Sequence, residues 1–170
     1  VKSGYGLSLE HELKMLRAVK QLNGLQAVKL VGTVLPLHAL PPEYEDARQE
    51  YLQSCFDELL PKVAAEKLAR FCDAFVELGA FTADEARALM KRARELGFIP
   101  RLHVDQLTAG REGAQLAAEL GCSSADHLEQ ISPEGIAALA RSNTVAVLAP
   151  TSTLFSRARP WAPGRAQRPG

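Results

Sequence analysis

Apolar residues recur along the chain with two spacings, one typical of amphipathic helices and the other of buried strands. The first helix is predicted to begin after Ser8, a favoured N-cap residue, and to end at Gly24. A second helix is predicted to begin at Thr82, since Thr82 and Glu85 have the spacing of a capping box, and to end at Gly97. The apolar positions of the first helix repeat every three or four residues: Leu9, Leu13, Leu16 and Val19.

Strand and helix patterns alternate through the rest of the chain. Short apolar segments predict strands over residues 27–38, 72–76, 98–103, 124–127 and 144–149, with a partial strand over residues 1–5. Helical patterns are predicted over residues 44–60, 62–70, 113–120 and 133–141, and Pro61 is expected to separate the first two. Such alternation is typical of right-handed β-α-β units with a mostly parallel sheet.

This pattern predicts an α/β fold, either most of a closed barrel or an open, doubly wound sheet. Five clear strands and one partial strand fall short of the eight that a closed (β/α)8 barrel needs. We predict one domain over residues 1–155 and an irregular tail over residues 156–170, rich in Arg, Pro and Gly. The chain begins with Val1, and we interpret it as an internal piece of a longer protein.

Composition bears on which classes of molecule the protein could bind and on where it resides. The 170 residues include 20 basic and 20 acidic side chains, so charge gives no reason to expect nucleic acid or an anionic membrane as a partner. No apolar run approaches the roughly 20 residues of a membrane-spanning helix, and no signal-peptide pattern opens the chain. Cys55, Cys72 and Cys122 show no Cys-x-x-Cys spacing, which predicts reduced thiols and a cytoplasmic protein.

Polar side chains end several of the predicted strands: Tyr5, His38, Glu77, His103 and His127. A single histidine at a strand end is more often structural than functional. Three of the four histidines, however, stand at the ends of separate strands, and these ends meet on one face of a parallel barrel. The pattern therefore predicts a shared functional pocket. The fourth, His11, lies between Glu10 and Glu12 in the first turn of a helix and is interpreted as a surface residue.

Neutral imidazole is a common ligand for zinc or iron, and a catalytic metal site keeps one position open for water. The chain has no His-x-His pair and no Asp after the last predicted strand, so it cannot complete such a site alone. Asp105 and Asp126 lie close to His103 and His127. Strand alternation directs the Asp126 carboxylate to the side opposite the adjoining His127, and we predict hydrogen-bonding or packing roles for both aspartates.

Several segments together resemble one enzyme family, in the same order and at similar spacing over residues 1–150. The segments are Val1-Lys2-Ser3-Gly4-Tyr5-Gly6-Leu7, His38-Ala39-Leu40-Pro41-Pro42-Glu43-Tyr44, Cys72-Asp73-Ala74-Phe75-Val76-Glu77, His103-Val104-Asp105-Gln106, Ser124-Ala125-Asp126-His127-Leu128-Glu129 and Thr144-Val145-Ala146-Val147-Leu148. On these residues the chain is similar to the imidazolonepropionases, which belong to the metal-dependent amidohydrolase superfamily.

The resemblance implies a fold, an activity and partners. The fold is a partial TIM-type (β/α)8 barrel containing about strands 2 to 7, with the first and last strands missing. The activity, in the full-length parent, is hydrolysis of the cyclic amide of 4-imidazolone-5-propanoate to N-formimidoyl-L-glutamate in histidine degradation. The resemblance also implies one divalent metal ion, zinc or iron, a small-molecule substrate and a homodimer.

Individual residues match positions of the family. His103 matches a metal ligand, and His127 and Gln106 match positions that take part in catalysis. Tyr5 matches a residue on the propionate or product side, His38 one that contacts the imidazolone, and Gln106 one that hydrogen-bonds the substrate ring. An amide cannot act as a general base, so that role falls to His127 or to an Asp outside the chain.

Two other interpretations stay open. One is another amidohydrolase, such as a deaminase of a nitrogen heterocycle, with the same barrel and histidine positions. The other is a catalytically inactive, truncated fragment. Because only one family-type metal ligand, His103, lies within the chain, we expect the isolated 170 residues to bind little zinc or iron.

Overall fold

A computed structural model of the chain describes residues 1–155, so the predicted tail over residues 156–170 lies outside the described part. The helices are α1 (Leu9–Leu22), the 3-10 helix η1 (Pro42–Tyr44), α2 (Arg48–Ser54), the π-helix η2 (Cys55–Leu59), α3 (Leu60–Ala65), α4 (Ala83–Glu95), α5 (Gly113–Glu119), α6 (Pro133–Ala140) and α7 (Pro150–Phe155). The strands are β1 (Thr33–Leu37), β2 (Phe71–Val76), β3 (Ile99–Pro100), β4 (Leu102–Val104), β5 (Ser124–His127) and β6 (Val145–Val147).

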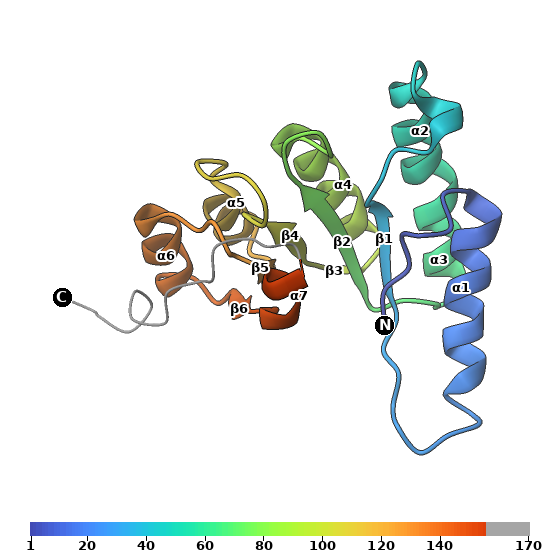
Figure 1. Ribbon diagram of the computed structural model, residues 1–170. Helices are drawn as coiled ribbons and strands as arrows, with labels where there is room; N and C mark the ends of the chain where they lie inside the picture. The colour runs from blue at the N-terminus through green and yellow to red at the C-terminus, as the bar shows by residue number, and fades with distance from the viewer. Residues whose placement is uncertain (156–170) are drawn as a thin grey trace.

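The strands form one six-stranded sheet in which all pairs are parallel. Its order is β1-β2-β4-β5-β6, and β3 pairs with β2. Helix α1 contacts β1, α4 contacts β2 and β3, and α5 contacts β4 and β5, while α6 packs on α5 (Figure 1). The predicted α/β class with a parallel sheet is therefore confirmed.

Strand β2 shows how the sheet separates its core from its functional face. Cys72, Ala74 and Val76 are buried in the hydrophobic core that the helices cover. Asp73 and Phe75 alternate with them and face the other side, where Phe75 lines a cavity. The open face of the sheet is thus available for a site.

Helix starts agree with the caps read from the sequence. The Ser8 side chain accepts a hydrogen bond from the His11 amide at the start of α1. The Thr82 and Glu85 side chains form the complete capping box of α4. These caps need only neighbouring residues, which explains why the sequence predicts them well.

Two predicted strands are shorter or broken. The strand expected over residues 27–38 is confined to β1 (Thr33–Leu37). Ahead of it, the Asn23 side chain bonds both backbone groups of Leu30 and closes a loop instead. The strand expected over residues 98–103 divides into β3 and β4 after Pro100, which has no N–H to donate to a ladder.

The predicted break at Pro61 is wrong. Helical structure runs through α2, η2 and α3 without interruption, and it ends at Ala65 rather than at residue 70. The π-helix accommodates the proline, because the Leu60 amide donates to the Cys55 carbonyl five residues earlier and shifts the hydrogen-bond pattern just before Pro61. Sequence periodicity cannot show such a shift.

No helix within residues 1–155 combines the length and the apolar character that crossing a membrane requires.

Three free cysteines lie in the core, and we expect them to resist alkylation in the folded protein. Burial raises the pKa of both Cys55 and Cys122 to about 12, and it raises that of Cys72 as well. At pH 8, roughly one thiol in 10⁴ is then a reactive thiolate at the first two positions. Mass spectrometry after a short iodoacetamide treatment should find all three unmodified, and all three modified in guanidinium chloride. Equal labelling in both conditions would contradict this burial.

Candidate active site at the carboxyl ends of the strands

All five site residues predicted from the sequence meet around one cavity of about 280 Å³. They are Tyr5, His38, His103, Gln106 and His127. The remaining lining residues are Lys2, Ser3, Leu35, Phe75 and Ser152. The cavity lies on the side of the sheet opposite the covering helices, since Phe75 lines it whereas Cys72 and Ala74 face the core. Ser152 of α7 lines it as well. The predicted shared pocket is therefore present, whereas the role of each residue stays a prediction.

The rings of His103 and His127 lie side by side, with centroids 5.2 Å apart. His103 belongs to β4 and faces the cavity. His127 pairs in register with Val104, so strict alternation places it on the helix-covered side. Positive φ angles at His127 (85°) and Leu128 (66°) end the strand there, and the imidazole reaches the cavity instead. Such backbone strain is a feature of functional sites.

Tyr5 and His38 form the opposite wall, with ring centroids 4.5 Å apart. The His38 Nδ1 lies 3.1 Å from the Gly4 carbonyl oxygen, which can only accept, so Nδ1 carries the proton. Its Nε2 is then left as an acceptor. Gly4 itself has φ +109°, and a Cβ there would lie 2.9 Å from the Leu35 carbonyl oxygen. Glycine is therefore needed for this approach.

Gln106 follows β4 and closes the cavity towards α7. Its Nε2 donates to the Ser152 Oγ at 3.3 Å. Ahead of it, Asp105 is buried and accepts hydrogen bonds from the Gly113 and Ala114 amides at the start of α5, each at 2.9 Å. The predicted hydrogen-bonding role of Asp105 is confirmed. Burial raises the pKa of the Asp105 carboxyl above its ordinary value.

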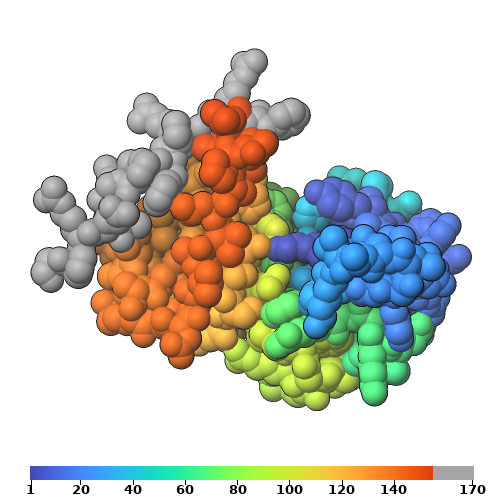
Figure 2. All heavy atoms as spheres, turned by 90° about the horizontal axis from the view of Figure 1, so that it is seen from below, coloured from blue at the N-terminus to red at the C-terminus, as the bar shows by residue number. Residues whose placement is uncertain are grey.

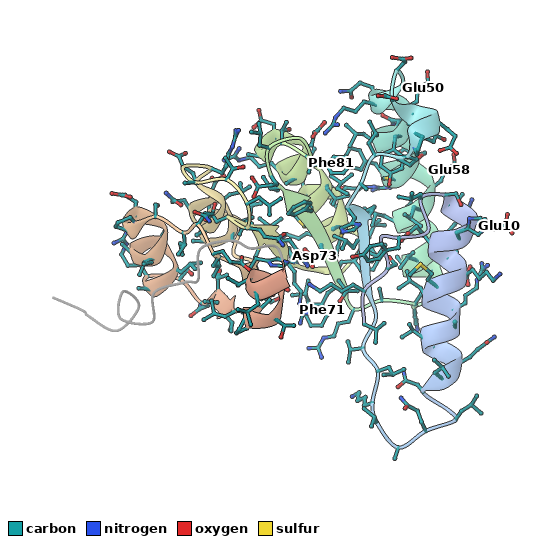
Figure 3. All side chains as sticks on the ribbon, in the orientation of Figure 1. Glu10, Glu50, Glu58, Phe71, Asp73 and Phe81 are labelled. Carbon is teal, nitrogen blue, oxygen red and sulfur yellow. The ribbon has the colours of Figure 1, made fainter. Side chains whose placement is uncertain are left out.

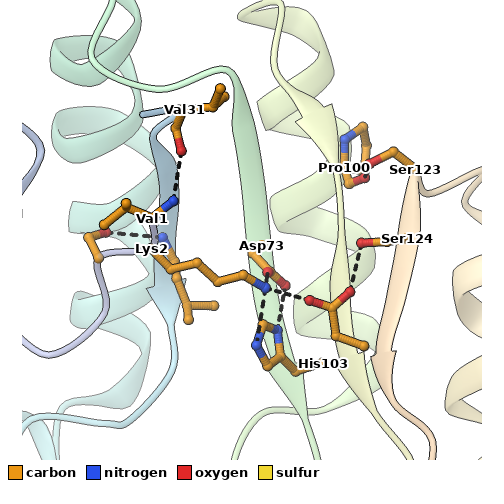
Figure 4. A network of polar contacts seen from close by, with 11 residues as sticks. Val1, Lys2, Val31, Asp73, Pro100, His103, Ser123 and Ser124 are labelled. Atoms are coloured by element: carbon orange, nitrogen blue, oxygen red, sulfur yellow. Dashed lines mark hydrogen bonds and ion pairs between the residues drawn. The ribbon is translucent and has the colours of Figure 1, made fainter. Parts of the chain in front are cut away.

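A polar network that includes the cavity residues Lys2 and His103 extends across three neighbouring strands (Figure 4). The Lys2 Nζ is 2.8 Å from the Asp73 Oδ2, 2.6 Å from the Asp126 Oδ2 and 3.2 Å from the His103 Nε2. The His103 Nδ1 is 3.0 Å from the Asp73 Oδ1. Ser124 Oγ donates to the Asp126 Oδ1 at 2.7 Å. Asp126 faces the side of His103 because these two residues are paired in register.

This network determines the tautomer of His103. An ionised carboxylate only accepts and an ammonium only donates, so Nδ1 donates a hydrogen bond to Asp73 and Nε2 accepts one from the Lys2 ammonium. Burial alone would raise the pKa of Asp73, but its hydrogen bonds and charge interactions with His103 and Lys2 lower it below the ordinary value. A carboxylate on Nδ1 is the arrangement that orients a metal-binding histidine through Nε2.

The donor set fits a divalent metal ion in part. Ligand atoms of Asp73, His103 and Asp126 all lie within 4.8 Å of one another, and imidazole and carboxylate suit zinc and iron alike. His103 also lines the cavity, which a catalytic ion would require. The described residues place no second imidazole in this ligand cluster. His103 is therefore the ligand that the described residues offer on the cavity side.

His127 has a carboxylate beside it. Its Nδ1 lies 3.5 Å from the Glu129 Oε1, which also accepts from the Thr153 hydroxyl at 3.0 Å. Burial, followed by the charge of His103, lowers the pKa of His127, while Glu129 opposes this shift. A neutral imidazole beside the cavity can accept a proton.

Glu77 and His11 lie apart from the cavity. Glu77 accepts hydrogen bonds from the amides of Leu78 (2.9 Å) and Leu107 (2.8 Å) and so fixes the loop after β4. His11 is exposed on the first turn of α1, as predicted.

Sequence reasoning missed Lys2, Asp73, Phe75 and Ser152 as residues of the site. A signal existed for Asp73, because an acidic residue inside an otherwise apolar strand is costly unless it is paired. Figure 3 shows the contrast: Glu10, Glu50 and Glu58 point outward from the helices, whereas Asp73 lies in the middle of the molecule. Its side chain has no exposed surface.

No protein-family model matches the chain. Individual relatives do. The chain is 58% identical over 165 residues to an imidazolonepropionase of Myxococcus xanthus (strain DK1622), and 52% identical over 168 residues to one of Anaeromyxobacter dehalogenans (strain 2CP-C). Each match covers 97% of this chain and 39% of the relative. An imidazolonepropionase of Streptococcus gordonii is 44% identical over 164 residues, which are 96% of this chain and 53% of that protein.

The resemblance read from the motifs is thus confirmed over nearly the whole chain. The chain spans about 39% of the length of the first of these relatives.

Proposed function

From this similarity to imidazolonepropionases, we propose that the chain forms part of an active site that hydrolyses 4-imidazolone-5-propanoate to N-formimidoyl-L-glutamate, in histidine degradation. The activity belongs to the full-length protein, since the chain spans only about 39% of these relatives. One observation carries the proposal: the five family-matched side chains, distant in sequence, line a single cavity.

We further propose that the parallel sheet is part of a TIM-type barrel and supplies about strands 2 to 7. Its six parallel strands and outer helices support this assignment. So does the position of the cavity, because the active site of such a barrel lies at the carboxyl ends of its strands. His103 in β4 and His127 at the end of β5 agree with that position.

Three residues are proposed to hold the substrate. Tyr5, at the rim with 74% of its surface exposed, would contact the propionate or product side. His38 would contact the imidazolone ring, using the Nε2 acceptor that its bond to Gly4 leaves free. Gln106 offers both a donor and an acceptor, which match the N–H and C=O edge of a cyclic amide.

The proposed reaction is addition of water to the ring carbonyl followed by cleavage of the ring C–N bond. His127 accepts the water proton as general base or, in its protonated form, hydrogen-bonds the oxyanion that develops on the substrate. The proton is then available for the nitrogen that leaves the carbonyl carbon. Burial keeps the pKa of His127 below its ordinary value, so a neutral imidazole is present to accept it.

One divalent ion, zinc or iron, is proposed to bind at the Nε2 of His103. When bound, such an ion polarises a carbonyl oxygen or lowers the pKa of water. Asp73 engages the Nδ1 of this imidazole and leaves Nε2 as the nitrogen that can bind an ion, which supports this choice of ligand atom. The remaining ligands would come from outside the chain, and imidazole does not distinguish zinc from iron.

We propose a small-molecule substrate, no nucleic-acid or membrane partner, and a homodimer for the full-length protein. A cytoplasmic location is also proposed. The even charge balance supports the absence of a nucleic-acid partner, and three free buried cysteines support a reducing compartment.

The full-length protein is expected to hydrolyse imidazolone propionate and to lose this activity on treatment with a metal chelator. The assay should include guanine and cytosine, the substrates of the competing deaminase interpretation. Ammonia release from these amines, without ring opening of imidazolone propionate, would overturn the proposal. The isolated 170-residue chain serves as the control and should bind little metal and show no hydrolysis, because His103 is the one residue of the sequence that matches a metal ligand of the family.

A further inference from the structure

The Lys2 ammonium lies at the centre of a ready-made set of metal ligands. Its Nζ contacts the Asp126 Oδ2 at 2.6 Å, the Asp73 Oδ2 at 2.8 Å and the His103 Nε2 at 3.2 Å (Figure 4). These three residues are the group whose ligand atoms lie within 4.8 Å of one another. Two carboxylates and one imidazole are a donor set that transition-metal ions accept. The ammonium therefore occupies the space that a divalent ion would take.

The backbone holds Lys2 in this place. Its neighbours bond across to β1, through the Ser3 amide to the Thr33 carbonyl (3.0 Å) and the Thr33 amide to the Val1 carbonyl (2.9 Å). From there the side chain crosses to β2, β4 and β5. Figure 2 shows N-terminal residues, in dark blue, between the lighter blue residues that follow them in the chain and the orange segment near the C-terminus.

The carboxylates also need a cation. Asp73 has no exposed side-chain surface and Asp126 is only 14% exposed, so two negative charges lie together in a poorly solvated place. Buried charges of one sign are costly unless an opposite charge compensates them. Within residues 1–155, Lys2 is the cation that forms an ion pair with both.

We propose that Lys2 is a built-in cation that withholds Asp73 and Asp126 from divalent metal ions. The two carboxylates are neutralised by an ammonium that cannot dissociate from the chain. An ion bound at the His103 Nε2 takes the one lone pair of that nitrogen, so a further ion would depend on Asp73 and Asp126, which Lys2 keeps paired. Lys2 thereby keeps a second ion out of this part of the site.

The test counts metal ions in variants of the full-length protein, without substrate. Metal-free protein is titrated with Co²⁺, followed by visible absorption and by elemental analysis after gel filtration. Lys2→Met, which keeps the length and removes the charge, is expected to bind one more Co²⁺ per chain than the unaltered protein. Lys2→Arg keeps the charge and is expected to bind no additional Co²⁺ ion. Any Co²⁺ binding at the extra site in Lys2→Arg should be at least about tenfold weaker than in Lys2→Met.

The double variant Lys2→Met, Asp126→Asn removes a ligand from the new site and should return the count to that of the unaltered protein. If Lys2→Met unfolds without metal, folding restored by Co²⁺ supports the proposal. Asp126→Asn alone keeps Lys2 and should leave the Co²⁺ count unchanged. The proposal is overturned by an equal count in folded Lys2→Met and unaltered protein, or by the loss of an ion in Asp126→Asn. Neither count depends on which substrate is hydrolysed.

Discussion

Replacing His127 by Asn is expected to lower kcat for imidazolone propionate in the full-length protein by about 10²–10⁴-fold, the usual contribution of a general acid or base. Asn can still hydrogen-bond in the cavity but cannot take up a proton. KM should change little, since the groups proposed to bind the substrate, Tyr5, His38 and Gln106, are unaltered. Steady-state kinetics at neutral pH separate the two parameters.

His11→Asn is the matched control, because His11 is exposed on α1 and lies outside the cavity. It should leave both kinetic parameters unchanged. Circular dichroism spectra of both variants should match that of the unaltered protein. If His127→Asn retains kcat within about threefold, His127 is not the group that moves the proton, and an Asp outside the chain must be considered.

Phe81→Ala is expected to lower the free energy of unfolding by about 3–5 kcal/mol, the usual cost of removing a buried aromatic ring. Phe81 is 1% exposed, and its ring stacks on that of Tyr51 at 6.4 Å between centroids. The Arg48 guanidinium lies 4.7 Å above it and is ion-paired to Glu85 at 2.6 Å. The ring thus joins the segment after β2 to α2 and to the capping box of α4.

Urea unfolding followed by circular dichroism measures this loss. Phe81→Leu keeps most of the apolar volume and should cost about 1–2 kcal/mol. Leu78→Ala, three residues earlier and 62% exposed, should change stability by less than about 0.5 kcal/mol. A loss for Phe81→Ala as small as that for Leu78→Ala would contradict the packing described for this ring.

Local features of the fold could be predicted from the sequence. The caps at Ser8 and Thr82 depend on side chains three residues apart, and both are present as predicted. The break expected at Pro61 failed because a proline can be accommodated when the preceding helical turn changes its hydrogen-bond pattern. Only coordinates show that η2 does this.

The candidate site, like the fold, could be predicted from the sequence only in part. Histidines at the ends of separate strands predict a pocket, and His38, His103 and His127 do line one cavity. Alternation nevertheless places His127 on the wrong side of the sheet, because it assumes regular strand geometry and φ at His127 is +85°. The contacts of Lys2 with Asp73 and Asp126 span 71 and 124 residues of sequence, so no local pattern could reveal them.

The sequence by itself determined the alternating order of helices and strands, that the strands run parallel, and which polar residues stand at their ends. These properties follow from periodicity, capping and chain connectivity, all of which act between near neighbours. Only the tertiary structure decided how the strands align, which side of the sheet each polar group faces, and that Lys2 lies among Asp73, His103 and Asp126. Register and reach across a sheet depend on contacts between distant segments, and spacing along the chain does not encode them.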